Sequence, residues 1–201
     1  MSEKYVDALL NIKTVGEQMG FYKATYYHRY EPTPYHALEH FFNHYELKSS
    51  DRIVDFGCGK GRMLFYIHYR FGATVTGIEM NESLYQDAVK NQIRYERKHT
   101  NRKGEIQFQC VYAEEYRINP MDNRFYFFNP FSIQIFIKVI NHILQSVEET
   151  QREVDLIFYY ISEDYIHYLE NSTSFELKEE IILPDLYVNN TNERFLIYTL
   201  T

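Results

Sequence analysis

Short apolar runs alternate with amphipathic stretches along most of the chain after residue 50. The amphipathic stretches have helical spacing, and in one of them Leu84, Ala88 and Ile93 lie close to one helical face. The runs predict strands at 52–56, 73–79, 105–111, 124–128 and 154–160, and helices at 61–71, 82–98 and 132–151. Strands that alternate with helices are typical of a parallel sheet built from βαβ units.

The C-terminal part of the chain has a different pattern. Residues 175–183 and 194–200 are two strand-like runs, and the turn residues Pro184-Asp185 and Asn189-Asn190 join them without an intervening helix. Such a pair predicts an antiparallel hairpin at one edge of the sheet. We therefore expect an α/β fold with a doubly wound, seven-stranded mixed sheet, mostly parallel, with helices on both faces.

The first 46 residues precede the predicted sheet. Residues 5–19 and 34–45 have helical patterns, and Thr33 is a suitable N-cap with Pro34 in the first turn. The segment between these helices, 21–35, is rich in tyrosine and phenylalanine. We expect residues 1–46 to form a helical and aromatic cap, with 21–35 as lid and substrate wall, over a Rossmann-like domain at 47–201.

Composition narrows the class of protein. The 201 residues fit one compact unit, and a net charge of −7 opposes binding to nucleic acid, so a small-molecule or protein partner is favoured. Cys58 and Cys110 cannot supply a disulfide framework. We find no secretory signal pattern and no apolar run of membrane-spanning length. These features predict a cytoplasmic protein without membrane association.

The densest motif is the D-x-G-x-G-x-G spacing of Asp55, Gly57, Gly59 and Gly61. The glycines let the backbone turn tightly off a strand and approach a ligand closely. A dinucleotide fingerprint would have glycine where this chain has Arg62. An acid at the strand end repels a pyrophosphate but suits an ammonium group. These features argue against an NAD-dependent oxidoreductase.

A second acid, Glu79, follows Gly59 by twenty residues, the distance at which an acid accepts hydrogen bonds from ribose hydroxyls. A ligand with ribose at one end and a positive group at the other matches S-adenosylmethionine. The segment closely resembles the cofactor motifs of class I S-adenosylmethionine-dependent methyltransferases, as in a small bacterial-type member. The resemblance covers residue 30 to the C-terminus. It implies cofactor contacts from the loop, Cys58 included, and from Glu79 and Met80.

Two further segments resemble cofactor contacts of this family. Thr33, within Tyr30-Glu31-Pro32-Thr33-Pro34, resembles the Thr-Pro motif of amino-methyltransferases. The resemblance implies that the helix N-terminus and the Thr33 hydroxyl hold the cofactor's carboxylate and that Tyr30 also contacts the cofactor. In Tyr112-Ala113-Glu114, Tyr112 replaces the acid that accepts the adenine amino group. The Ala113 backbone and Glu114 would then take that role, or the segment is a structural turn.

Asn129-Pro130-Phe131 follows the fourth predicted strand and resembles the Asn/Asp-Pro-Pro-aromatic tetrad of methyltransferases that act on nitrogen. The resemblance implies that the Asn129 oxygen and a proline carbonyl accept the target's N–H bonds while Phe131 stacks on its plane. This chain has one proline, so the tetrad is incomplete. The alternative is a strand-ending turn in which Asn129 contacts the cofactor only.

Two other clusters have simpler interpretations. His36, His40 and His44 share one helix side but span about 12 Å, too far for one metal ion, so we expect no metal site. A basic run at the end of a predicted helix fits a solvated helix terminus stabilised by the helix dipole. This run contains Lys90, Arg94, Arg97, Lys98, Arg102 and Lys103.

The sequence therefore predicts an S-adenosylmethionine-dependent methyltransferase that releases S-adenosylhomocysteine. The acceptor stays open, and a nitrogen of a small molecule, a protein or a nucleobase is compatible with the motifs. The alternative from another class is a non-catalytic protein that binds S-adenosylmethionine or S-adenosylhomocysteine. The incomplete tetrad and the lack of a dedicated general base leave that alternative open.

Overall fold

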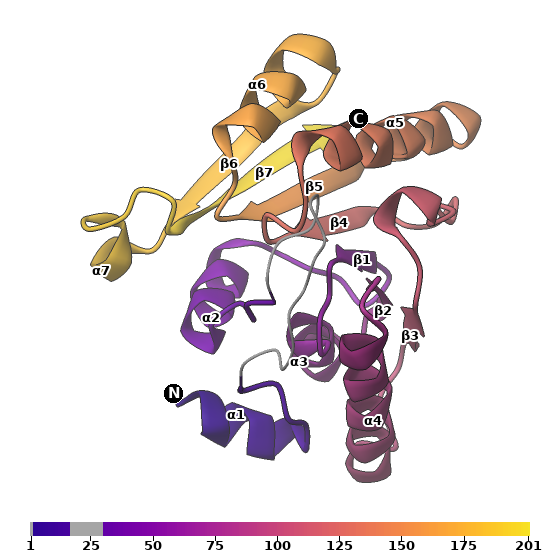
Figure 1. The fold of residues 1–201 in the computed structure, drawn as a ribbon, viewed down its shortest axis with the longest axis vertical. Helices are drawn as coiled ribbons and strands as arrows, with labels where there is room; N and C mark the ends of the chain where they lie inside the picture. Colours follow the sequence, from indigo (N-terminus) through magenta and orange to yellow (C-terminus); the bar gives the residue numbers. More distant parts are fainter. Residues whose placement is uncertain (1, 17–29) are drawn as a thin grey trace.

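The computed structural model describes residues 2–16 and 30–201, which fold around one seven-stranded sheet (Figure 1). The strand order is β3-β2-β1-β4-β5-β7-β6. Strands β1 to β5 are parallel, and β7 is antiparallel to both β5 and β6, so the predicted mixed sheet with a C-terminal hairpin is confirmed. The strands are β1 Arg52–Phe56, β2 Thr74–Ile78, β3 Ile106–Gln109, β4 Arg124–Phe127, β5 Val154–Tyr159, β6 Glu176–Ile182 and β7 Arg194–Leu200.

Helices cover both faces of the sheet. Successive side chains of a strand point to opposite faces, so Tyr126 and Ile157 pack toward α2 and α3, whereas Phe125 and Leu156 pack toward α5. No helix in the described part of the chain is long and apolar enough to cross a membrane. The helices are α1 Glu3–Leu10, α2 Tyr35–His44, α3 Arg62–Phe71, α4 Glu82–Lys98, α5 Ile133–Glu149, α6 Glu163–Ser172 and α7 Pro184–Tyr187, with a 3-10 turn, η1, at Ala113–Glu115.

The N-terminal helices differ from the sequence prediction. Helix α1 ends at Leu10 because Asn11 adopts a left-handed conformation, with φ of 58°. The expected helix over 5–19 is therefore wrong for residues 11–16, and its last part lies outside the described residues. Residues 17–29, which include most of the expected aromatic lid, lie outside the described residues. Helix α2 begins at Tyr35 with Pro34 as N-cap, so Thr33 is not its cap.

The C-terminal part contains two helices that the sequence patterns did not predict. One turn of helix, α7, lies between β6 and β7, and Pro184 begins it because its fixed φ suits a first helical turn. Helix α6 connects β5 to β6 and buries Tyr165 and Leu169, which are four residues apart. The strands β6 and β7 pair as expected, but the expectation that no helix lies between them is wrong because of the single turn α7.

A buried polar network joins α1 to the body of the domain. Arg62, at the start of α3, donates from Nε to Thr14 Oγ1 at 2.7 Å and forms an ion pair with Glu3. Asp7 accepts a hydrogen bond from the Thr14 amide at 2.6 Å and another from the Tyr35 hydroxyl at 2.7 Å. Because these groups are mostly buried, they fix α1 against α2 and α3, directly beside the glycine loop.

Strand β6 forms one open edge of the sheet. Nearly all its residues are exposed, among them Glu176, Glu179 and Glu180, and its register with β7 is irregular between Leu177 and Glu179. Charged side chains and a local bulge are common on such edges, because they disfavour pairing with another strand.

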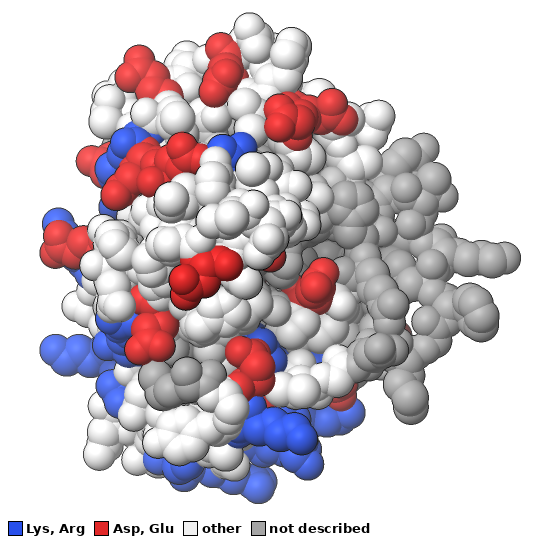
Figure 2. All heavy atoms as spheres, turned by 90° about the vertical axis from the view of Figure 1, so that its left-hand side faces the viewer, with Lys and Arg blue, Asp and Glu red and all other residues white. Residues whose placement is uncertain are grey.

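Opposite charges gather at opposite ends of the molecule (Figure 2). On the face shown, most lysines and arginines lie at the lower end, and most acids lie over the middle and upper part. Part of the basic run packs against the fold: Lys98 Nζ donates to the carbonyls of Ala8 and Leu9 at 3.2 and 3.0 Å, and the Arg102 guanidinium lies 4.3 Å from the ring centroid of Tyr69. Residues 148–194 contain twelve acidic and three basic residues, which gives the upper end its negative charge.

Candidate active site

The glycine loop turns from the end of β1 over the end of β2. The amides of Gly57 and Cys58 donate to the Ile78 carbonyl at 2.9 and 3.1 Å. Gly57, Gly59 and Gly61 all have positive φ, at 83°, 54° and 83°. Side chains rarely adopt this conformation, so the alternating glycines are needed for the turn itself.

Two neighbours pack directly on this loop. A Cβ atom added at Gly59 would lie 2.1 Å from the Tyr30 ring, and one added at Gly57 would lie 2.7 Å from Pro130 Cβ. The Tyr30 hydroxyl donates to the Thr14 carbonyl at 3.0 Å, which holds the ring over the loop. The structure therefore brings the predicted cofactor loop, Tyr30 and the loop after β4 into one place.

Asp55 lies near the end of β1 and is 5% exposed. Within the described part of the chain, its carboxyl group forms no hydrogen bond or ion pair. Burial, and then the nearby charge of Glu79, raises the pKa of Asp55 well above its usual range. A buried carboxyl group without a partner fits an incoming ammonium group, such as that of S-adenosylmethionine, so this residue is compatible with the cofactor.

Glu79 follows β2 and is also buried. Its Oε2 accepts a hydrogen bond from the Gly59 amide at 2.9 Å, and its Oε1 accepts one from the Asn81 amide at 2.7 Å. Burial raises the pKa of Glu79, whereas these amides favour the charged form. The carboxylate ties the glycine loop to the end of β2, and its remaining lone pairs suit ribose hydroxyls.

Replacing Glu79 with Ala should weaken S-adenosylhomocysteine binding by about 1–3 kcal/mol, because ribose donors lose a charged acceptor. The same change should lower the free energy of unfolding, because the Gly59 and Asn81 amides lose their acceptor. Glu79→Gln, which keeps one acceptor oxygen, should fall between the two proteins in both measurements. Calorimetric titration and urea unfolding provide the values. An unchanged dissociation constant in Glu79→Ala would remove this residue from the site.

Cys58 and Met80 flank these acids. The Cys58 thiol is buried, and its sulfur would lie 2.6 Å from a Cβ atom at Gly77, so it fills the space between the loop and β2. Burial raises the pKa of this thiol, which keeps it protonated and unreactive. Met80 is partly exposed directly after Glu79. Their cofactor contacts stay predictions.

Thr33 lies in front of α2, where the resemblance expects the cofactor's carboxylate. Its hydroxyl shares a 2.7 Å hydrogen bond with the Tyr126 hydroxyl, and its carbonyl accepts one from Arg62 at 3.3 Å. The first helical amide, that of Tyr35, donates to Glu3 Oε1 at 3.0 Å. In this structure an acid from α1 therefore lies at the helix N-terminus, and the proposed Thr33 contact stays a prediction.

The loop after β4 carries the expected acceptor motif. Asn129 has a positive φ of 39°, and both Asn129 and Pro130 are partly exposed. Phe131 is 1% exposed, and its ring packs edge-on against Phe127 at 6.3 Å between centroids, in the core beneath α5. The burial of the Phe131 ring does not support stacking on an acceptor, and that role stays a prediction. Phe128, on the other side of the sheet, is partly exposed.

The expected adenine segment follows β3. Ala113 and Glu114 lie in η1, where Ala113 is buried and Glu114 Oε1 lies 3.9 Å from Lys138 Nζ of α5. Tyr112 is 48% exposed. The segment begins at the carboxyl end of β3, next to Glu79 at the carboxyl end of β2. The Glu79 amide donates to the carbonyl of Gln109, the last residue of β3, at 3.1 Å. Its contact with adenine stays a prediction.

Sequence analysis missed Tyr160, which follows β5. Its φ is 57°, in the left-handed region. The neighbouring parallel strands β4 and β5 are therefore each followed by a left-handed residue other than glycine, Asn129 after β4 and Tyr160 after β5. Such residues cost free energy and cluster at functional sites. Asparagine tolerates this conformation, but tyrosine does not favour it, and the sequence holds no signal that would reveal it.

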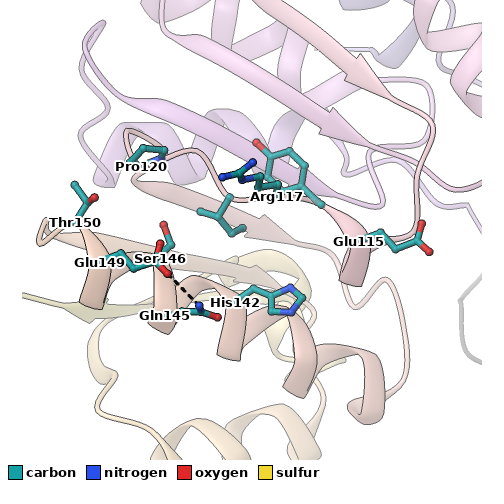
Figure 3. A pocket seen from close by; sticks show the side chains of 10 residues that line it. Glu115, Arg117, Pro120, His142, Gln145, Ser146, Glu149 and Thr150 are labelled. Carbon is teal, nitrogen blue, oxygen red and sulfur yellow. Dashed lines mark hydrogen bonds between the residues drawn. The ribbon is translucent and has the colours of Figure 1, made fainter.

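A separate hollow of about 500 Å³ lies between α5 and the segment after η1 (Figure 3). Arg117 and Glu115 border it from one side, and His142, Gln145 and Glu149 of α5 border it from the other. Since α5 runs back toward the start of β5, this hollow lies near the amino ends of the strands. None of the predicted site residues lines it.

Within residues 2–16 and 30–201, no group of three or more histidine, cysteine or acidic side chains could hold a metal ion. The histidines of α2 contact one another instead: the rings of His40 and His44 lie 4.5 Å apart, and His44 Nδ1 is within 2.9 Å of the His40 carbonyl.

The strand order, the glycine loop and the two strand-end acids define the fold of class I S-adenosylmethionine-dependent methyltransferases. Residues 35–124 match the sequence profile of a family described as a methyltransferase domain. The fold is that of this class, and solved structures that share it contain S-adenosyl-L-homocysteine, which is consistent with S-adenosylmethionine as the cofactor. None of the curated proteins compared with this chain matches its sequence.

Solved structures of several methyltransferases share the fold. An RNA methyltransferase from Salinibacter ruber, in complex with S-adenosyl-L-homocysteine, has a TM-score of 0.52 and 17% identity over 85% of this chain and 93% of its own. An S-adenosylmethionine-dependent methyltransferase from Thiobacillus denitrificans, with the same ligand, has a TM-score of 0.54 and 12% identity over 85% and 92%. Geranyl diphosphate C-methyltransferase from Streptomyces coelicolor has a TM-score of 0.53 and 10% identity over 82% and 77%.

Proposed function

We propose that this protein transfers a methyl group from S-adenosylmethionine to a nitrogen of a small molecule or a protein, at the loop that follows β4. The observation that carries the proposal is the contact between Pro130 and Gly57, where an added Cβ atom would lie 2.7 Å from the proline. This contact puts Asn129 next to the part of the loop that borders the cofactor's amino-acid end. An acceptor beside Asn129 would therefore face the methyl group.

The residues of the site divide into two sets by role. Asp55 holds the ammonium group, the glycine loop approaches the cofactor's amino-acid part, and Glu79 accepts from the ribose. Asn129 and the Pro130 carbonyl accept N–H bonds of the acceptor and so direct its lone pair. When bound, the cofactor supplies a methyl group already activated on a sulfonium, so the protein contributes mainly by positioning.

Residues 1–46 would form the cap of this site. The hydrogen bonds of Glu3, Asp7 and Thr14 fix α1 beside the loop, and Tyr30 lies directly on Gly59. Both observations support a cap that belongs to the site rather than to a separate unit.

The protein should bind S-adenosylmethionine and S-adenosylhomocysteine but not NAD. Asp55 repels a pyrophosphate, and Arg62 takes the place of the third fingerprint glycine. Calorimetric titration with each ligand tests this prediction. NAD binding without a response to S-adenosylhomocysteine would refute the proposed function. Cofactor binding with no methyl transfer to any cellular extract would instead favour a non-catalytic binding protein.

A further inference from the structure

Three aromatic side chains meet where β4 and β5 end. The ring centroids of Phe128 and Tyr159 lie 4.8 Å apart, and the Tyr160 centroid lies 6.3 Å from Phe128 and 6.2 Å from Tyr159. Phe128 and Tyr160 are partly exposed, whereas Tyr159 is buried beneath them. We call these three residues the aromatic cluster. Phe128 and Tyr160 are thus the parts of the cluster that a ligand at this edge of the sheet can reach.

Two carboxylates accompany the aromatic cluster. The Tyr159 hydroxyl donates a hydrogen bond to Glu193. Burial raises the pKa of Tyr159, and the hydrogen bond to Glu193 and the charges of Glu193 and Glu31 raise it further. Neither glutamate forms an ion pair with a lysine or arginine in the part of the chain that the structure describes. The Asn190 side chain donates to the Tyr160 hydroxyl at 2.6 Å and so fixes the direction of that phenol.

The aromatic cluster borders the acceptor side of the proposed site. Phe128 directly precedes Asn129, and β4 and β5 are neighbouring parallel strands, so Tyr160 leaves the sheet beside Asn129. Glu31 directly follows Tyr30, whose ring covers Gly59. The rings and carboxylates therefore lie around the point where an acceptor must enter to reach the methyl group.

Aromatic rings beside carboxylates favour the binding of a positively charged acceptor. Aromatic faces attract cations, and two carboxylates without a basic partner add to that attraction. The same charges repel a phosphate backbone, and the acids of the upper end of the molecule extend the negative potential. On the face that Figure 2 shows, most lysines and arginines lie at the opposite end of the molecule, whereas Lys60 Nζ lies 5.4 Å from the centroid of the Tyr30 ring.

We propose, on the basis of the methyl transfer proposed above, that the acceptor is an alkyl amine carried by a cationic molecule, bound between the aromatic cluster and the carboxylates of Glu31 and Glu193. The amine gives up one proton to water as it loses contact with solvent. Its lone pair then forms the N–CH₃ bond, while the S–CH₃ bond breaks with its electron pair moving to sulfur. The products are a methylated ammonium and neutral S-adenosylhomocysteine. A polyamine and a lysine side chain both contain such an alkyl amine.

The test uses the whole chain and begins with S-adenosylhomocysteine titration. Loss of that binding refutes the proposed function itself. Spermidine, an acetylated and amidated lysine pentapeptide and a short single-stranded RNA are then titrated in the presence of S-adenosylhomocysteine, and assayed with methyl-labelled S-adenosylmethionine. We expect binding and methyl transfer with at least one amine, and the two amines distinguish a small-molecule from a protein source. Binding of neither amine, or transfer to RNA alone, overturns the inference and leaves the cofactor assignment intact.

Variants test the two carboxylates separately. Glu193→Gln and Glu31→Gln should each raise the KM for the amine by about tenfold, with kcat within about threefold, because they remove charge that binds the acceptor. Glu31 is exposed, so its replacement leaves folding unchanged even if Glu193→Gln does not fold. Glu180→Gln is the matched control, because Glu180 pairs with Arg194 on the surface. Equal KM values for Glu31→Gln and Glu180→Gln would overturn the inference.

Discussion

Replacing Asp55 with Asn should weaken S-adenosylhomocysteine binding about a hundredfold, or about 2.7 kcal/mol, and at the same time stabilise the ligand-free protein. The first effect follows because the amide cannot offer a full negative charge to the ligand's ammonium group. The second follows because an amide costs less to bury than a carboxylate that has no partner. Calorimetry measures the affinity, and urea unfolding measures the stability.

The stability effect of Asp55 also has a defined pH dependence. Its pKa is raised above 3.8 in the folded protein, so the native state holds a proton that the unfolded state releases. The ligand-free protein should therefore lose stability as pH rises from about 4 through the native pKa, and Asp55→Asn should remove part of that slope. Asp185→Asn, on the exposed turn α7, is the control. Unchanged ligand affinity in Asp55→Asn would exclude Asp55 from the ammonium site.

Replacing Asn129 with Ala should cut the rate of methyl transfer about a hundredfold, or about 2.7 kcal/mol, while cofactor affinity changes far less. The reason is that the Asn129 oxygen would orient the acceptor's lone pair and not the cofactor. Single-turnover rates with labelled cofactor give the measurement, with spermidine, the lysine pentapeptide or the protein itself as acceptor.

Asn129→Gly separates the side chain from the backbone at this position. Because φ is 39°, alanine adds backbone strain that glycine does not. Equal losses in both variants would assign the effect to the amide side chain, whereas full activity of Asn129→Gly would assign it to strain. If Asn129→Ala abolishes cofactor binding but spares turnover per bound cofactor, Asn129 belongs to the cofactor site and the nitrogen-acceptor proposal fails.

The sequence predicts the sheet well because its strands are strongly patterned. The continuous apolar run at 154–160 becomes the buried β5, and the run before Asp55 becomes β1. The glycine loop was predictable because its backbone geometry requires a particular residue type. Positive φ at three alternating positions favours glycine, so the three glycines indicate the turn.

Features that depend on distant contacts could not be read in this way. The family resemblance predicts Phe131 as a stacking ring, whereas packing against Phe127 buries it in the core, and residue order alone does not reveal that packing. Tyr160 and Glu193 carry no local signal, and only the pairing of β5 with β7 brings the ends of these strands together. Helix α1 ends early because one asparagine adopts a left-handed conformation, which propensity does not predict.

The open edge at β6 has a consequence for the behaviour of concentrated protein. A second molecule that approached this edge as an added strand would bring its own Glu176, Glu179 and Glu180 close to the same residues, and the irregular register would interrupt the hydrogen-bond ladder. The charge part of this barrier weakens in acid or high salt, whereas the bulge remains. Two features therefore protect the sheet edge from ordered aggregation. The repulsion between glutamates depends on pH and salt, whereas the irregular register depends only on the backbone.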